Sequence, residues 1–185
     1  MTDTLHLQHL GACRTAFANV PESAGRILLV GEDNPISAAP EHALFCAPDG
    51  CAGQRLQAKI FGLPRAEYLA MWRTNLCVGG WSIKKARDRA AALMHGEVPW
   101  RAIVMLGRKV ADAFSASLMR SGYDISLNPF ESAEVPSVEA MPRLTLYSLP
   151  HPSGRNLIWN RPGPVTDAQQ IMCEVADDLA WGLLT

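Results

Sequence analysis

The stretch RILLV, residues 26–30, is a short run of aliphatic side chains that ends at a glycine. Two later runs have the same form: AIVML at residues 102–106 is followed by glycine, and LTLYSL at residues 144–149 is followed by proline. Continuous apolar runs of this length are typical of strands buried on both faces of a parallel sheet. A fourth strand is expected around residues 72–77.

Helical patterns lie between and after these runs, and this alternation produces parallel strands joined by crossover helices. The helices are expected at about residues 53–61, 65–72, 83–94, 109–121 and 166–184, the last beginning at a Thr-Asp cap. The sequence therefore predicts a single-domain α/β protein spanning residues 1–185, with a three-layer α/β/α architecture and a mostly parallel four-stranded central sheet. In such a sheet, ligands bind beyond the carboxyl ends of the strands.

The chain has 185 residues, of which 48% are hydrophobic, enough for one domain with a sizeable core. Its formal net charge is -1, so the whole molecule has no strong attraction for a polyanion. The charges are segregated, however. Residues 51–110 hold eleven basic and three acidic side chains, a local excess of +8, while acidic residues concentrate at 124–139 and 174–178. This segregation favours one phosphate-binding face, although solvated helix faces produce similar runs.

The N-terminus has no basic patch followed by an apolar run, and no apolar stretch approaches the roughly 20 residues needed to cross a bilayer. We therefore expect a cytoplasmic protein without membrane association. In that compartment the five cysteines are expected to be reduced thiols rather than disulfides. We further expect a monomer that needs no metal ion or other cofactor.

Two of the loops at the strand ends carry polar residues suited to chemistry. The first, GEDNP at residues 31–35, places Asp33 and Asn34 side by side after a tight glycine turn. The second, HPSGRNLIWN at residues 151–160, holds His151 between two prolines and then puts large apolar side chains on an expected surface loop. Each also has a plainer interpretation: the first as an ordinary turn, and the second as a proline-rich loop whose tryptophan packs into the core.

Together the two loops resemble the signature motifs of the uracil-DNA glycosylase superfamily. GEDNP is similar to the loop that carries Asp or Asn before a proline, and HPSGRN is similar to the His-Pro-Ser motif of the single-strand-selective members. The resemblance extends from about residue 26 to residue 159 through Phe45, Thr74-Asn75 and IVMLGRKVADA at residues 103–113. It implies that family's fold and a DNA glycosylase, which hydrolyses the N-glycosidic bond of uracil or a modified pyrimidine flipped out of single- or double-stranded DNA.

The resemblance also implies roles for individual residues. His151 would donate a hydrogen bond to the departing pyrimidine, and either Asp33 or Asn34 would orient the attacking water. Counting from the glycine favours Asp33, counting back from the proline favours Asn34, and a carboxylate would also stabilise the cationic sugar. The base would be bound by Glu32, Phe45 and Asn75. DNA would be contacted by Ser153, Arg155, Asn156, Leu157 and Ile158, the last two as an apolar wedge.

Three alternatives remain open. Cys46, Cys51 and Cys77 lie near places where some branches of the superfamily hold an iron-sulfur cluster, but three thiols do not make the four-ligand site. A hydrolase would use Ser153 or Cys77 as nucleophile with His151 as base, although no nucleophile elbow is present. A glycosylase-like domain that binds modified bases, DNA or a protein partner without cleavage is favoured by the shifted Asp-Asn register of the first loop.

Overall fold

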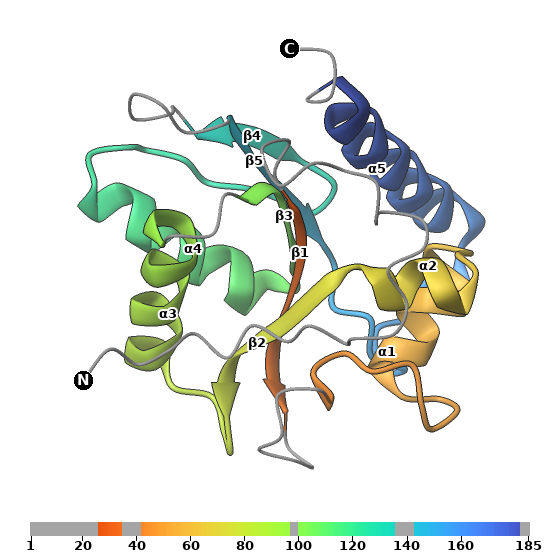
Figure 1. Ribbon diagram of the computed structural model, residues 1–185. Coiled ribbons are helices and arrows are strands. Elements are labelled where there is room, and N and C mark those ends of the chain that lie inside the picture. The colour runs from red at the N-terminus through yellow and green to blue at the C-terminus, as the bar shows by residue number, and fades with distance from the viewer. Residues whose placement is uncertain (1–25, 35–41, 97–99, 136–142, 182–185) are drawn as a thin grey trace.

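The centre of the molecule is a mixed five-stranded sheet. The computed structural model describes residues 26–34, 42–96, 100–135 and 143–181 (Figure 1). The strands are β1 (Arg26–Asn34), β2 (Trp72–Val78), β3 (Trp100–Leu106), β4 (Ser132–Val135) and β5 (Leu144–Leu149). Their order across the sheet is β2-β1-β3-β5-β4, and all neighbours are parallel except β4 and β5. The predicted α/β fold with a mostly parallel sheet is confirmed.

The prediction of four strands is wrong because it missed β4, which pairs antiparallel with the outer side of β5. This strand reads SAEV, and only Val135 in it is buried. A four-residue segment with Ser, Ala and Glu has low strand propensity, so the apolar pattern used to find the other strands does not mark it.

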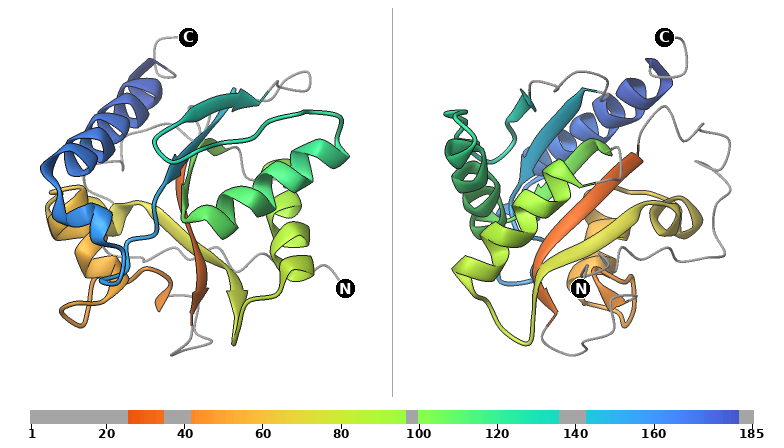
Figure 2. Two further views of the ribbon diagram at one scale, coloured as in Figure 1. Left: turned by 180° about the vertical axis from the view of Figure 1, so that it is seen from behind. Right: turned by 60° about the vertical axis from the view of Figure 1, so that its left-hand side comes forward.

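Helices cover both faces of the sheet, as the two views of Figure 2 show. The helical elements are α1 (Ala52–Gln54), the π-helical turn η3 (Arg55–Ile60), α2 (Arg65–Ala70), α3 (Ile83–His95), α4 (Arg108–Arg120), the 3₁₀ turn η4 (Leu157–Asn160) and α5 (Pro162–Trp181). Among the described residues, none of these helices is both long enough and apolar enough to span a membrane.

Each face of the sheet has its own hydrophobic core, and β1 contributes to both. Ile27 and Leu29 pack on the side of η3, α2 and α5, whereas Leu28 and Val30 pack on the side of α3 and α4. Successive side chains of a strand point to opposite faces, so a strand between two helical layers must be apolar at every position. This double burial is the physical reason for the uninterrupted RILLV run.

Two element boundaries differ from expectation. β1 continues four residues past Val30, so Gly31 to Asn34 belong to a strand that pairs with β2 rather than to a free loop. Helix α5 begins at Pro162, because the fixed φ of proline and its missing N–H are compatible with the first helical turn. Thr166 is therefore inside the helix, where its Oγ1 donates to the carbonyl oxygen of Pro162 at 3.2 Å.

Candidate functional site

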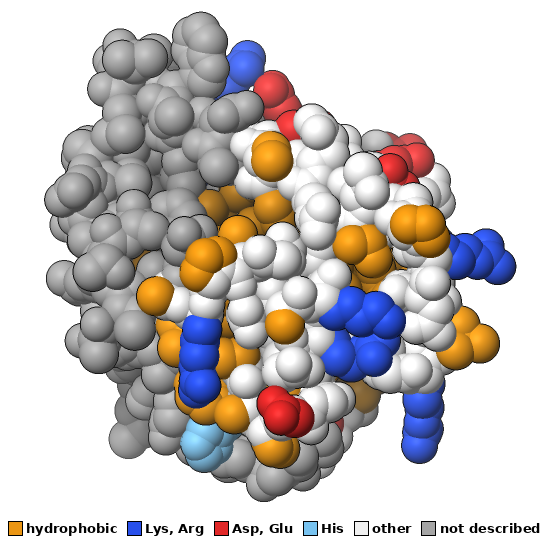
Figure 3. All heavy atoms as spheres, turned by 90° about the vertical axis from the view of Figure 1, so that its right-hand side faces the viewer, with side chains coloured by type: hydrophobic (Ala, Val, Ile, Leu, Met, Phe, Trp, Pro, Cys, Tyr) orange, Lys and Arg blue, Asp and Glu red, His pale blue; other side chains and the backbone are white. Residues whose placement is uncertain are grey.

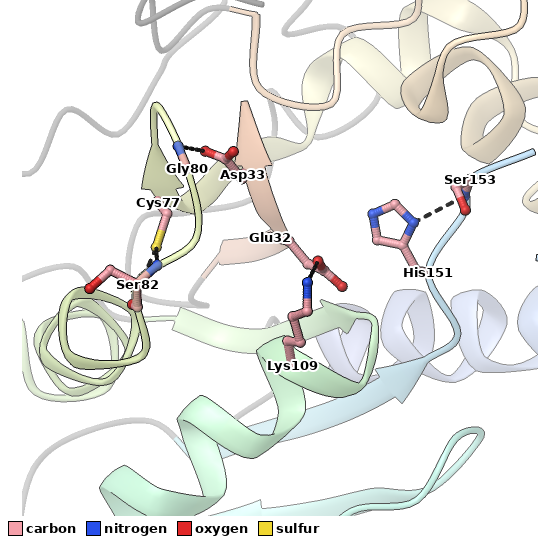
Figure 4. Close-up of polar contacts among 8 residues, drawn as sticks. All are labelled: Glu32, Asp33, Cys77, Gly80, Ser82, Lys109, His151 and Ser153. Atoms are coloured by element: carbon pink, nitrogen blue, oxygen red, sulfur yellow. Dashed lines mark hydrogen bonds and ion pairs between the residues drawn. The ribbon is translucent and has the colours of Figure 1, made fainter. Parts of the chain in front are cut away.

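The sheet has a topological switch point between β1 and β3. The chain passes from β1 to β2 on one side and then returns to β3 on the other, so the connections after β1 and β3 lead away from each other. Ligands of open α/β sheets bind in the crevice at such a point, beyond the carboxyl ends of the strands. Glu32 and Asp33 lie near the carboxyl end of β1. Gly107 follows β3, and His151 lies just after β5. Figure 4 shows the acidic residues and His151 at this edge.

The imidazole of His151 is held as a hydrogen-bond donor. Its Nδ1 accepts a hydrogen bond from the backbone N–H of Ser153 at 3.1 Å. An accepting nitrogen carries no proton, so the neutral ring has its proton on Nε2. Burial lowers the pKa of His151 below its usual 6.5; the Glu32 carboxylate opposes this shift and the Lys109 ammonium adds to it. At neutral pH the ring therefore presents an Nε2–H donor.

Contacts to the backbone fix the loop that carries this ring. The carbonyl oxygen of His151 accepts from Trp159 Nε1 at 2.9 Å and from Asn156 Nδ2 at 3.1 Å. Arg55 Nε from η3 donates to the carbonyl oxygen of Pro152 at 3.2 Å. Trp159 is fully buried, so the loop follows the plainer interpretation at this residue, in which its tryptophan packs into the core, and the expectation of an exposed tryptophan is wrong. The buried indole anchors the loop to the core and also donates a hydrogen bond to its backbone, a combination that a large aromatic with an N–H can provide.

Among the described residues, Glu32 brings a carboxylate close to His151. Its Oε2 pairs with Lys109 Nζ of α4 at 3.1 Å, as drawn in Figure 4. A methyl group added to Gly107 would lie 2.9 Å from Glu32 Oε1 and 3.2 Å from His151 Cβ. Gly107 also has a φ of 108°, which favours glycine. The absence of a side chain at this position lets the acid and the imidazole approach each other.

Sequence reasoning overlooked Lys109 and Gly107 as site residues. The signal was present in IVMLGRK, where a buried strand ends in Gly107 and a helix follows with Lys109 at its second residue. What the sequence alone did not supply is the neighbour of that strand, because the pairing of β1 with β3 is a long-range property of the sheet.

The carboxylate of Asp33 is directed away from His151 in Figure 4. Its Oδ1 accepts a hydrogen bond from the backbone N–H of Gly80, in the β2–α3 connection, at 3.2 Å. The backbone of Asn34 pairs with Val78, but its side chain lies outside the described residues. The geometry therefore brings Glu32 rather than Asp33 up to the imidazole.

Asn75 of β2 contributes an amide to the same edge of the sheet. Its side chain is 8% exposed and makes no hydrogen bond within the described part of the chain. The amide oxygen lies over Gly31 so closely that a Cβ at Gly31 would collide with it, and Leu44 flanks the same spot at 3.2 Å. A buried amide without a partner has an unfilled hydrogen-bonding capacity.

The segment that carries Leu44 and the expected stacking residue Phe45 is fixed by α2. Tyr68 donates its phenolic O–H to the carbonyl oxygen of Leu44 at 2.6 Å, and burial raises the pKa of this phenol. Phe45 is half-buried, and the guanidinium carbon of Arg65 lies 5.8 Å from its ring centroid. Phe45 thus has a defined place near the carboxyl ends of β1 and β2, with a cation over its ring.

The residues expected to contact DNA differ in solvent exposure and in whether their polar groups are already hydrogen-bonded within the loop. Arg155 is exposed and Leu157 is 69% exposed, whereas Ile158 is partly buried against the core. The amide of Asn156 is occupied by the loop itself: Nδ2 donates to the carbonyl oxygen of His151, and Oδ1 accepts from the N–H of Ile158. Figure 3, which views the molecule from the side of α2 and α5, shows Lys and Arg side chains projecting among hydrophobic ones.

The cysteines that the structure describes are free thiols, and two of them make local hydrogen bonds. Cys77 Sγ accepts from the N–H of Ser82 at 3.4 Å, and Cys51 Sγ accepts from the N–H of Gln54 and so caps α1. Within the described ranges, no three His, Cys, Asp or Glu side chains come together in a group that could hold a metal ion. The hydrogen bond from Ser153 to the His151 imidazole comes from the Ser153 backbone N–H.

No model of a known protein family matches the chain, and no curated protein is detectably similar to it. The site thus consists of a neutral imidazole donor, an ion-paired carboxylate and an amide that makes no hydrogen bond to the described residues, at one rim of the sheet. Such a set of groups can bind a planar polar ligand and stabilise negative charge that develops on it.

Proposed function

We propose that the chain is a DNA glycosylase with the three-layer fold of the uracil-DNA glycosylase superfamily. It hydrolyses the bond between deoxyribose and a pyrimidine base that has been flipped out of DNA. The observation that carries this proposal is the state of His151: its Nδ1 is occupied by the Ser153 N–H, so a neutral Nε2–H donor is available at the switch point of the sheet.

Departure of a pyrimidine from its sugar leaves negative charge on the base oxygens and positive charge on the sugar. A fixed neutral donor stabilises the first charge without adding a second cation beside the sugar. The bonds from Trp159 and Asn156 to the His151 carbonyl support this role, because a donor contributes most when its position is set before the reaction.

The amide of Asn75, which makes no hydrogen bond to the part of the chain that the structure describes, supports recognition of a pyrimidine edge. An amide offers one acceptor and two donor hydrogens, which complement the N3–H and O4 of a uracil-like base. The amide lies above Gly31, where only a glycine leaves room for it. In this assignment the base lies against backbone rather than a side chain at that position. Phe45 supplies the aromatic face for stacking in this assignment.

Attack on the sugar carbon needs an oriented water. In our proposal Asp33 or Asn34 performs this task, and the Glu32 carboxylate contributes negative potential beside the cationic sugar. Leu157, 69% exposed directly after the His151 loop, fills the gap left by the flipped base. Arg155 and the N–H groups around Ser153 contact the flanking phosphates.

A second candidate function is binding of modified bases or DNA without cleavage. It is favoured by one observation: Asp33 is engaged by the N–H of Gly80 and its carboxylate points away from His151. A carboxylate held there does not orient a water at the sugar. Cleavage by the glycosylase mechanism then depends on Asn34, or on release of Asp33 from Gly80.

Purified protein should be incubated with single- and double-stranded oligonucleotides that contain uracil, 5-hydroxymethyluracil or glucosylated hydroxymethylcytosine, followed by alkali to cleave abasic sites. We expect strand scission with at least one substrate, and a loss of about 10²–10³-fold in His151→Ala, because one charge-stabilising donor is removed. His95→Ala is the matched control, since His95 is exposed at the end of α3. Tight retention of DNA without base release would reject the glycosylase and support the binding function, and the absence of both base release and retention would reject both functions.

A further inference from the structure

Two charged residues beside His151 form an ion pair that sequence comparison with the glycosylase motifs does not assign. Glu32 reaches the site from β1, and Lys109 reaches it from the first turn of α4, with 3.1 Å between Oε2 and Nζ. We propose that Lys109 is a positioning residue that offsets the Glu32 carboxylate, so that an acid lies beside His151 while the imidazole stays neutral and protonated on Nε2. The proposal deepens the glycosylase function and rests on it only for the activity measurements.

Glu32 lies close enough for its charge to act on the His151 imidazole. Both residues border the space beside Gly107, where a Cβ would lie 2.9 Å from Glu32 Oε1 and 3.2 Å from His151 Cβ, and this glycine carries no side chain. Glu32 is shielded, with 22% of its side chain exposed, so its charge is not fully screened by water. A lone carboxylate at this place favours the imidazolium form of His151.

Formation of the imidazolium would disrupt the loop. A proton on Nδ1 would face the N–H of Ser153, so the hydrogen bond of 3.1 Å that fixes the ring would become a contact between two donors. Lys109 opposes this outcome, because its ammonium neutralises the Glu32 carboxylate and itself repels a second positive charge nearby. The pair thus lets an acid stand next to the imidazole without protonating it.

The location of Lys109 is otherwise unfavourable. A cation in the first turn of a helix is opposed by the positive end of the helix dipole. Two contacts compensate for this cost: the ion pair with Glu32 and the Trp81 ring, whose centroid is 5.5 Å from Nζ. Both contacts draw the ammonium toward the end of β1, while 56% of the Lys109 side chain stays exposed.

Charged and polar groups reach His151 from several elements. Within the described residues, β1 presents Glu32, α4 presents Lys109, and the loop itself presents the Ser153 N–H. From η3, Arg55 donates to the carbonyl oxygen of Pro152 and so meets the backbone next to His151. Burial lowers the pKa of His151, the Glu32 carboxylate raises it, and the Lys109 ammonium lowers it. The two charges of the pair therefore act in opposite directions.

The direct test is an NMR titration of the His151 imidazole in the full chain, with its signals assigned by comparison with His151→Gln. Lys109→Met should raise the His151 pKa, because it leaves the carboxylate unopposed while the stem over Trp81 is retained. Glu32→Gln should lower it. The double variant should return close to the wild-type titration, a pattern that loss of packing alone does not produce.

A matched control is the surface pair Arg143–Glu134, which joins the start of β5 to β4 at 3.3 Å with both side chains well exposed. Arg143→Met and Glu134→Gln should leave the His151 titration unchanged. Shifts of the same sign in the two site variants, or no shift in either, would overturn the proposal. This arm needs no substrate, so it stands whether or not the protein cleaves DNA.

The activity arm uses the ratio of base-release rates at pH 6 and pH 8. Lys109→Met should lower this ratio by roughly threefold, because more of the histidine is protonated at pH 6, and Glu32→Gln should raise it. Opposite titration shifts in a protein that releases no base would retain the positioning role and reject the glycosylase. Base release with an unchanged ratio in both variants would retain the glycosylase and reject the positioning role.

Discussion

The loop after β5 and the end of β1 meet at the same site, but they are held in place by different kinds of contact. The His151 loop is fixed by a fully buried tryptophan and by an amide from within the loop, eight and five positions further along the chain. The end of β1 is fixed by partners 47 and 77 positions away: the N–H of Gly80 on Asp33 and the ammonium of Lys109 on Glu32.

This difference separates a rigid part of the site from an adjustable one. The imidazole is positioned mainly by part-buried, short-range bonds within its own loop, to which Arg55 adds one long-range bond at Pro152. The acids are positioned by half-exposed contacts that ionic strength, pH or a bound ligand can exchange. We therefore expect substitutions in the loop to act mainly on stability, and substitutions at the end of β1 to act mainly on chemistry.

The largest effect is expected for Trp159→Ala, which tests whether the tryptophan is the anchor of the rigid part. It removes a fully buried indole and one of the two donors to the His151 carbonyl, so the free energy of unfolding should fall by about 3–5 kcal/mol. Urea unfolding measures this change. Trp159→Phe should cost clearly less, because it keeps most of the volume and loses the N–H. A cost below about 1 kcal/mol for the alanine variant would contradict the comparison.

The next effect is expected for Gly107→Ala, at the border between the two regions. The new methyl group would crowd Glu32 and His151 and also meet an unfavourable φ of 108°, at a cost of about 1–3 kcal/mol together with loss of base release. Gly122→Ala provides the control, because Gly122 has a φ of 87° but no atom within 4 Å of the added group. Equal destabilisation in the two variants would show that crowding at the site is not important.

A smaller effect is expected for Asn156→Ala, which removes the second donor to the His151 carbonyl and the cap on η4. The free energy of unfolding should fall by about 1 kcal/mol in thermal or urea unfolding. Asn160→Ala removes only an exposed bond from Lys59 and should cost less than about 0.5 kcal/mol. If the two variants lose the same free energy of unfolding, the loop does not depend on the Asn156 amide.

The smallest effect is a pH dependence of stability. Because the folded-state pKa of His151 lies below its usual 6.5, the unfolded chain takes up the proton first. The contribution of His151 to stability is thus complete above pH 6.5 and is lost as the pH falls through the lowered folded-state value. Urea unfolding at pH 7.5 and pH 5.5 should show a smaller difference for His151→Gln than for the wild type. A larger difference in the variant would mean that folding does not lower the pKa of His151.

The sequence predicts those parts of the fold that depend on local pattern. The apolar runs at 26–30, 102–106 and 144–149 become β1, β3 and β5, because each is buried on both faces. Helix α3 begins at Ile83 as expected, since Ser82 caps it through a bond from the N–H of Lys85. The short strand β4 was missed because pairing rather than local propensity produces it, and the helix expected at about residues 53–61 consists of α1 followed by the π-helical turn η3.

The site was predicted in the same uneven way. The placement of His151 at a strand end follows from a motif that contains its own fixing residues, Asn156 and Trp159. The partnership of Glu32 with Lys109 joins the end of β1 to the start of α4, and no local pattern shows which strands become neighbours. Gly31 to Asn34 were expected in a loop, but pairing with β2 draws them into the sheet.

The antiparallel strand β4 has a consequence for how the molecule opens. By pairing with the outer side of β5, it converts the strand that delivers His151 from a sheet margin into an inner strand with partners on both sides. Backbone amides in such a strand exchange with deuterium only in rare, extensive openings, whereas amides at a margin exchange by local fraying. The support beneath the imidazole should accordingly be among the last parts of this chain to exchange its protons with solvent.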